Sequence, residues 1–249
     1  MATFKEQVQG ITNLTIDGTG ANAGPSKDEL LSFILDGINE VVTKWLLVNP
    51  QDALLFARES SEYTANGVEL PTGKVISVIR ESGTNDDWRM CRLVPHALAE
   101  RVKDSTSIHY ASKYNPAYYV GGLRQLSILP VPDTGGADSW KMIYVEYNSN
   151  TDTDDNELTV DSDSIKYFPK KLYNLVVKYA ALKCFEAKIA EYSVIEEDSE
   201  LVSSLANSYN ALKAEYDQIY GLAAKSAMKT GTGAGAEEVP EQQEVEEEE

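Results

Sequence analysis

The sequence predicts an α+β protein: an α-helical bundle with an inserted small antiparallel β domain and a flexible acidic C-terminal tail. Apolar residues recur at three- and four-residue spacing near both ends of the chain, which is typical of helices. Short β-branched and aromatic runs, separated by turn residues, occupy the middle. We therefore assign the helical bundle to residues 26–50 and 164–228, and the β domain with one short helix to residues 51–150.

The N-terminal segment, residues 1–25, is rich in small and polar residues, and its apolar residues show only weak periodicity. We expect an N-terminal arm that is either loose or ordered on assembly, with modest helical potential at its start. The first strong helix follows, where Ser26 and Glu29 form an S-x-x-E capping box. Its apolar face runs to about Leu47, and we expect the helix to end before Asn49-Pro50.

The middle of the chain changes to the period of strands. Runs such as "GKVISVIRES", "PAYYV" and "WKMIYVEYN" are β-branched or aromatic, and "DALLFARES" is interpreted as a further run of this kind. Asn66-Gly67 and Gly121-Gly122 supply turns. One short helix, "PHALAERVKD", interrupts the strands, with Pro95 in its first turn. No long helix separates the strands, so we expect antiparallel pairing.

The C-terminal part predicts two more helices. After the acidic connector "SNTDTDDNELTVDSDS", one helix is expected from Phe168 to about Tyr192 and another from about Ser199. Their apolar stripes indicate an αα-hairpin, whose simplest partner is the helix that begins at Ser26. Residues 229–249 are a Gly-rich linker and an acidic tail, which we expect to be disordered when alone.

The charge of the chain restricts its partners. The formal net charge is −18, and the last fourteen residues contain eight glutamates, so the rest of the chain carries −10. Such a body is a poor general binder of nucleic acid, because phosphates are neutralised by Lys and Arg. It suits a protein that stands near DNA without adhering to it.

The sequence indicates neither a membrane partner nor secretion. No apolar run approaches the roughly 18 residues of a membrane span, and the start of the chain lacks the pattern of a secretory signal. Cys91 and Cys184 fit buried thiols in a reducing compartment, with a disulfide as the less favoured alternative.

No catalytic set emerges, and we expect neither enzymatic activity nor a cofactor. His96 and His109 have no Cys or His at zinc-ligand spacing. Cys91 lies in an apparent strand, which favours a packed thiol over a nucleophile, although Arg89 and Arg92 beside it could lower its pKa. The segment "GTGAGA" follows a helix instead of a strand, which favours a linker over a phosphate-binding loop.

The acidic connector holds a weak candidate for a metal site. Asp152, Asp154, Asn156 and Asp163 occupy positions 1, 3, 5 and 12 of an EF-hand-like loop. However, Glu157 stands where the sharp turn requires Gly, and Asp replaces the usual bidentate Glu. A solvated loop is the default expectation, and weak calcium binding is the alternative.

The tyrosines suggest an interaction surface. The segment from Ala111 to Gly136 predicts a hairpin with tyrosines on one arm and a bend at Gly121-Gly122. Exposed tyrosines provide large contact area at low entropic cost, although a location in the core is equally compatible with the pattern. The candidate interface residues are Tyr114, Tyr118, Tyr119, Leu129, Tyr209, Tyr216, Glu246 and Glu247.

Several segments together resemble head-to-tail connector proteins of tailed bacteriophages, also called adaptor, head-completion or neck proteins. These segments are "DELLSFILDGINEVV", "VPHALAERVKDSTSIHYASKYNPAYYVGG", "LSILPVPD" and "FPKKLYNLVVKYAALKCFEAKIAEYS". The resemblance spans roughly Ser26 to Tyr220, and its motifs are non-catalytic. The long acidic tail departs from it and matches no motif of the family.

The resemblance implies a homo-oligomeric ring, commonly twelve-fold, that docks beneath a portal protein and extends the DNA channel toward a tail or nozzle protein. DNA would pass through this channel without sequence-specific binding. Such a chain is a structural protein of the virion neck that is assembled in the host cytoplasm. By the same analogy, we expect the glutamate tail to order against basic grooves of the portal.

Two other functions stay open. In the first, the chain is a binding module of the virion or cell surface, and Tyr114, Tyr118 and Tyr119 hold a glycan. Such a module would bind sugar as a free protein, whereas a connector would form a ring on its portal. In the second, the chain is an enzyme, and an activity lost on changing Cys91 but not Cys184 would support it.

Overall fold

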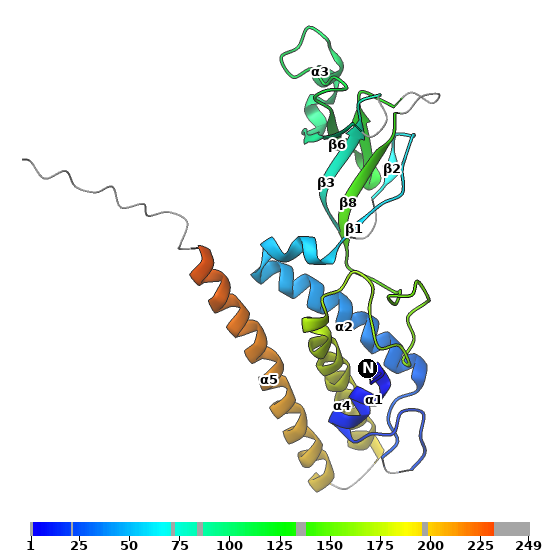
Figure 1. The fold of residues 1–249 in the computed structure, drawn as a ribbon. Helices are drawn as coiled ribbons and strands as arrows, with labels where there is room; N and C mark the ends of the chain where they lie inside the picture. The colour runs from blue at the N-terminus through cyan, green and yellow to red at the C-terminus, as the bar shows by residue number, and fades with distance from the viewer. Residues whose placement is uncertain are drawn as a thin grey trace, which may run out of the picture.

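The chain forms a two-lobed structure in the computed structural model, which describes residues 2–20, 22–70, 73–83, 87–132, 138–195 and 199–231. One lobe, the bundle, is helical and is built from both ends of the described chain. The other, the β lobe, comprises residues 57–147 and projects from one end of the bundle (Figure 1). Helices and antiparallel sheets are both present, so the predicted α+β class is confirmed.

Four α-helices make the bundle, and α4 is its central element. They are α1 (Phe4–Thr12), α2 (Lys27–Val48), α4 (Tyr173–Ile195) and α5 (Ser199–Gly231). α1, α2 and α5 all pack against α4. α4 is buried on most sides, so its buried residues are not confined to the one apolar stripe that the sequence predicts. α5 runs along the outside of the bundle (Figure 1).

Local signals fix both ends of α2. The backbone N–H of Glu29 donates to Ser26 Oγ (3.2 Å), and the backbone N–H of Ser26 donates to the Glu29 carboxylate (2.8 Å). The bond donated to the carboxylate by the Ser26 backbone, and after it the one donated by the Ser26 hydroxyl (2.9 Å), hold the pKa of Glu29 below its usual value. α2 ends at Val48, and Asn49-Pro50 follows, as the sequence predicts.

The N-terminal segment is packed into the bundle, which corrects the expectation of a loose arm over residues 1–25. Phe4 and Val8 are fully buried, and the Phe4 ring lies 6.0 Å from that of Tyr173. The backbone N–H of Phe4 also donates to the carbonyl of Ser162 (2.9 Å). Two buried apolar side chains one turn apart are enough to anchor the segment, because residues from distant parts of the chain pack around them.

Two four-stranded sheets make the β lobe. The first has the order β1-β8-β3-β4 and consists of β1 (Ala57–Glu59), β8 (Trp140–Glu146), β3 (Gly73–Glu81) and β4 (Trp88–Met90). The second has the order β2-β7-β6-β5 and consists of β2 (Val68–Glu69), β7 (Gln125–Leu129), β6 (Ala117–Val120) and β5 (Arg92–Leu93). Every pair is antiparallel except β5 with β6.

The predicted hairpin is present, but one neighbouring strand pair differs from expectation. β6 pairs antiparallel with β7, with Tyr118 opposite Ile128, and the 3-10 helix η3 (Gly122–Arg124) forms the bend. β5 pairs parallel with β6, because η2 (His96–Leu98) and α3 (Ala99–Lys103) return the chain to the start of the sheet. This connection is long enough for a parallel crossover, but its α-helix, α3, has only 5 residues, which explains why the sequence pattern did not indicate it.

Two element boundaries also differ. Most of the predicted strand "DALLFARES" is the 3-10 helix η1 (Pro50–Phe56), and only β1 pairs as a strand. Pro50 in the first turn favours this helical start. The helix expected from Phe168 begins instead at Tyr173, after the 3-10 turn η4 (Lys170–Leu172).

Each lobe has its own hydrophobic core. The bundle core is the largest and includes Phe4, Ile34 and Val176. The sheets enclose a second core around Trp140. A third, smaller cluster lies toward the outer end of the β lobe and consists of Val94, Val102, Ala111, Ala117 and Leu129. The outer part of the β lobe is therefore packed independently of the bundle.

Candidate interaction surface

Exposed apolar side chains gather in residues 88–131, which we call the distal segment. Of the fifteen large apolar side chains that are exposed among the described residues, eight lie there: Met90, Leu93, Ile108, Tyr110, Tyr114, Val120, Leu123 and Val131. Ile108 is 96% exposed and Leu123 is 88% exposed. A concentration of this kind is typical of surfaces that contact another protein.

The distal segment also differs in charge from the stretches of the chain that form the bundle. The distal segment has six Arg and Lys residues and two Asp and Glu residues. The stretches that flank the β lobe, residues 1–56 and 148–231, together have twelve basic and twenty-one acidic residues. The distal segment is therefore basic and apolar, whereas the bundle is acidic.

A hollow of about 220 Å³, which we call the tip groove, lies within the distal segment. Its walls are Val102, Lys103, Tyr110, Ala111, Leu129, Pro130 and Val131. α3 contributes Val102 and Lys103, and the backbone N–H of Ala111 donates to the Val102 carbonyl (2.9 Å), which fixes the next loop against α3. The Lys103 ammonium contacts Glu100 (2.7 Å), and this hydrogen bond raises the pKa of Lys103.

Further cations contact the groove residue Tyr110 and the nearby residue Tyr114. The Arg89 guanidinium lies 5.4 Å from the centre of the Tyr114 ring, and the Lys113 ammonium lies 5.2 Å from it. Arg92 donates to the carbonyl of Tyr110, a groove residue, at 3.3 Å. Since Tyr114 is 61% exposed, an aromatic face flanked by two cations is available in the distal segment, three residues along the chain from the groove residue Ala111.

Three of the predicted interface residues are buried within the chain, which corrects their assignment. Tyr118 is 9% exposed, Leu129 is 4% exposed and Tyr216 is 3% exposed. Burial raises the pKa of Tyr118. Tyr216 packs against the rings of Tyr179 and Tyr220, at 6.3 Å and 5.2 Å. Strand alternation and helix periodicity turn these side chains inward, so they stabilise the chain itself.

The remaining predicted residues differ in accessibility. Tyr114 is exposed, whereas Tyr119 and Tyr209 are half-buried. Glu246 and Glu247 lie outside the described residues. The three tyrosines of the glycan hypothesis do not share one surface, because Tyr118 faces the core. The glycan function itself stays a prediction.

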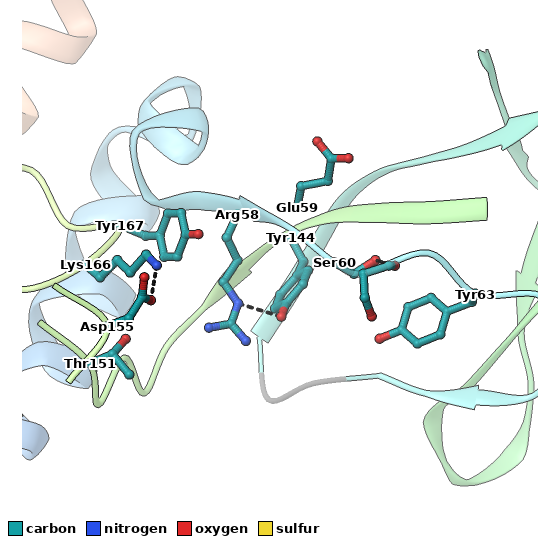
Figure 2. A pocket seen from close by; sticks show the side chains of 10 residues that line it. Arg58, Glu59, Ser60, Tyr63, Tyr144, Thr151, Asp155, Lys166 and Tyr167 are labelled. Carbon is teal, nitrogen blue, oxygen red and sulfur yellow. Dashed lines mark hydrogen bonds and ion pairs between the residues drawn. The ribbon is translucent and has the colours of Figure 1, made fainter. Parts of the chain in front are cut away.

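A second hollow, of about 350 Å³, lies where the β lobe joins the bundle (Figure 2). Arg58 Nε donates to the Tyr144 hydroxyl (2.5 Å), and the Arg58 guanidinium pairs with Glu146 (2.5 Å). Across the hollow, Lys166 pairs with Asp155. Because these charges already satisfy one another, a polar ligand would have to displace the pairs, and we assign them a structural role at the junction.

The acidic connector uses its carboxylates to shape its own loop. Asp152 Oδ1 accepts hydrogen bonds from the backbone N–H groups of Asp154 (2.8 Å) and Asn156 (3.0 Å). In the part of the chain that the structure describes, no three His, Cys, Asp or Glu side chains gather as a metal site. Asp152, Asp154, Asn156 and Asp163 are therefore not assembled as a ligand set.

The cysteines are free, buried thiols in different lobes. Burial raises the pKa of Cys91 and of Cys184 to about 12 in each case. The cation that opposes this effect at Cys91 is Arg80, and its influence is the smaller one. Lowering of the Cys91 pKa by Arg89 and Arg92, the argument against a packed thiol, is therefore not found, because burial disfavours the thiolate.

Comparison with known protein families and with curated proteins finds no match to this chain. Among the described residues, no helix combines the length and the apolar composition that a membrane crossing requires. The tip groove is the feature that sequence analysis missed. Its one visible signal was the excess of Arg and Lys in the distal segment, within a chain that is acidic elsewhere.

Proposed function

We propose that the chain is a non-enzymatic structural protein of a tailed-bacteriophage virion. In this proposal it is an adaptor that assembles as a ring in the neck, joins the portal protein to a tail or nozzle protein and extends the DNA channel. The observation that carries the proposal is the gathering of exposed apolar side chains on a lobe that projects from a separately packed bundle. Such a lobe is suited to contact with another protein.

The acidic bundle supports the same function. Residues 1–56 and 148–231 carry nine more acidic than basic groups. A surface of this sign repels the phosphates of DNA, so DNA could slide past it without adhering. The charge of the bundle thus agrees with a wall of a channel, and disagrees with a site that grips nucleic acid.

α5 offers a long side for contact between subunits. The helix has 33 residues, which corresponds to about 50 Å. Leu212 and Tyr216 are buried on one face, whereas most of the remaining described side chains of the helix are exposed. A neighbouring subunit could pack along this outer face while the core of each bundle stays unchanged.

Mass photometry of the purified chain, alone and mixed with the portal protein of the same virus, tests the proposal. We expect a monomer or weak oligomer alone and a ring-sized species on the portal, whose mass gives the number of subunits. A chain that stays monomeric and ignores the portal at micromolar concentration would contradict the proposal. Glycan arrays would then test the alternative function.

A further inference from the structure

The tip groove combines an apolar floor with a cationic rim. Val102 and Leu129 are 0% and 4% exposed and form the floor, whereas Val131 is 53% exposed at the edge. The Lys103 ammonium at the rim pairs with Glu100, whose side chain is 85% exposed. An exposed pair of this kind contributes only about 0–1 kcal/mol, so an incoming carboxylate can compete for Lys103.

The C-terminal segment of the chain has the complementary composition. Residues 237–249 contain eight glutamates, and three residues without charge or hydrogen-bonding side chains interrupt them: Val239, Pro240 and Val245. The segment is therefore acidic with isolated small apolar groups. A groove that binds it requires both cations and an apolar hollow of modest volume.

We propose that the tip groove binds residues 237–249 of a second copy of the chain. Val239 and Pro240 fill the apolar hollow, and the flanking glutamates pair with Lys103 at its rim and with Lys113 beside Tyr114. The binding brings together a basic distal segment and an acidic tail, which are the two regions of opposite charge in the chain.

The reach of the tail favours a second copy over the same chain. From Gly231 to Val239 the chain advances eight residues, which span at most about 28 Å when fully extended. A flexible Gly-rich stretch of that length spans about 16 Å on average. The β lobe is longer, since the nine residues of β3 alone cover about 30 Å and α3 lies beyond its far end (Figure 1).

This inference rests on the proposed function in one respect only: copies of the chain must lie side by side. It assigns a contact that closes or strengthens such an assembly, with the tail of one subunit seated on the distal segment of the next. It also departs from the expectation that the tail orders against the portal, so the two sites can be compared directly.

Fluorescence anisotropy with a labelled peptide of residues 232–249 and the full-length chain tests the inference. The groove variant carries Lys103→Glu and Val131→Asp. The control carries Lys74→Glu in β3 and Leu54→Asp in η1, which make the same total charge change at exposed residues outside the groove. We expect the groove variant to weaken binding by about tenfold or more, and the control to change it by less than about twofold. A peptide with all eight glutamates replaced by Gln should also bind about tenfold more weakly.

Several results would overturn the inference. One is equal binding of the peptide by the groove variant and the natural chain, with circular dichroism confirming that both are folded. Another is groove-dependent binding of short double-stranded DNA or of phosphatidylserine vesicles, with peptide binding unaffected. A third concerns the source of the tail: if a full-length chain with its own eight glutamates changed to Gln binds the peptide about tenfold more tightly, the groove takes its own tail.

The portal is absent from this assay, which separates the two proposals. Peptide binding that depends on the groove, combined with no ring on the portal, would support this inference and contradict the proposed function. A ring on the portal, combined with no groove-dependent peptide binding, would support the proposed function and contradict this inference.

Discussion

The bundle and the β lobe use apolar side chains in opposite ways. In the bundle, Phe4, Ile34 and Val176 are fully buried in one continuous core. In the β lobe, the cores are small, and residues such as Ile108 and Leu123 point into solvent. The charges differ as well: the β lobe has ten basic and eleven acidic residues, whereas the bundle is acidic. Changes in the bundle should therefore alter stability, and changes in the distal segment should alter contacts.

The largest effect on stability is expected at Phe4. Phe4→Ala removes a fully buried ring and should lower the free energy of unfolding by about 3–5 kcal/mol. Chemical denaturation followed by circular dichroism measures this change. Ile11→Ala in the same helix is the control. Because Ile11 is 39% exposed, this change should lower the free energy of unfolding much less. A small effect at Phe4 would mean that α1 is not part of the bundle core.

The close approach of α2 to α4 should give the next largest effect. A Cβ atom on Gly37 would lie 3.1 Å from Tyr179 Cδ1 and 3.3 Å from the Val176 carbonyl oxygen. Gly37→Ala should therefore destabilise the protein by about 1–3 kcal/mol. Gly10→Ala in α1 is a matched substitution with no atom within 4 Å, and should stabilise by about 0.5–1 kcal/mol. Equal effects in thermal unfolding would contradict this packing.

The two thiols allow the lobes to be compared by pH. Each has a pKa near 12 in the folded chain, against a usual value of 9.0, so the unfolded chain loses the proton first as the pH rises. The contribution of each thiol to the free energy of unfolding is therefore fully present below pH 9 and is lost as the pH rises toward 12. Between pH 9 and pH 10 the loss is about 1 kcal/mol per thiol. Cys91→Ala and Cys184→Ala should each flatten the measured dependence of unfolding on pH. An unchanged dependence would show that the thiol opens to solvent in the native state.

The smallest effect on stability is expected in the distal segment. Ile108→Ser combined with Leu123→Ser changes two side chains that are 96% and 88% exposed. The free energy of unfolding should change by about 0.5 kcal/mol or less. A larger loss in chemical denaturation would place these side chains in the packing of the β lobe.

The sequence predicted those parts of the fold that local signals determine. The capping box at Ser26 and the stop at Asn49-Pro50 depend on neighbours in the chain, and both ends of α2 followed from them. The burial of Phe4 could not be predicted, because its partners come from residues far along the chain. The parallel pairing of β5 with β6 likewise depends on a tertiary arrangement and not on a local pattern.

The candidate surface was predicted only in part. The hairpin followed from the pattern, but alternation alone did not reveal that Tyr114 is exposed and that Tyr118 faces the core. The tip groove combines α3, the loop around Tyr110 and the end of β7. Its residues are too far apart in the sequence to form a motif, so only their shared basic surroundings were visible.

Mass photometry with the portal protein tests the central claim most directly when two variants are compared. One carries Ile108→Ser and Leu123→Ser in the distal segment. The other carries Leu47→Ser and Leu54→Ser, which are leucines at the end of the bundle that meets the β lobe, 79% and 68% exposed. We predict that the distal variant fails to form the ring-sized species and that the bundle variant still forms it. Ring formation by the distal variant, together with its loss in the bundle variant, would contradict the account.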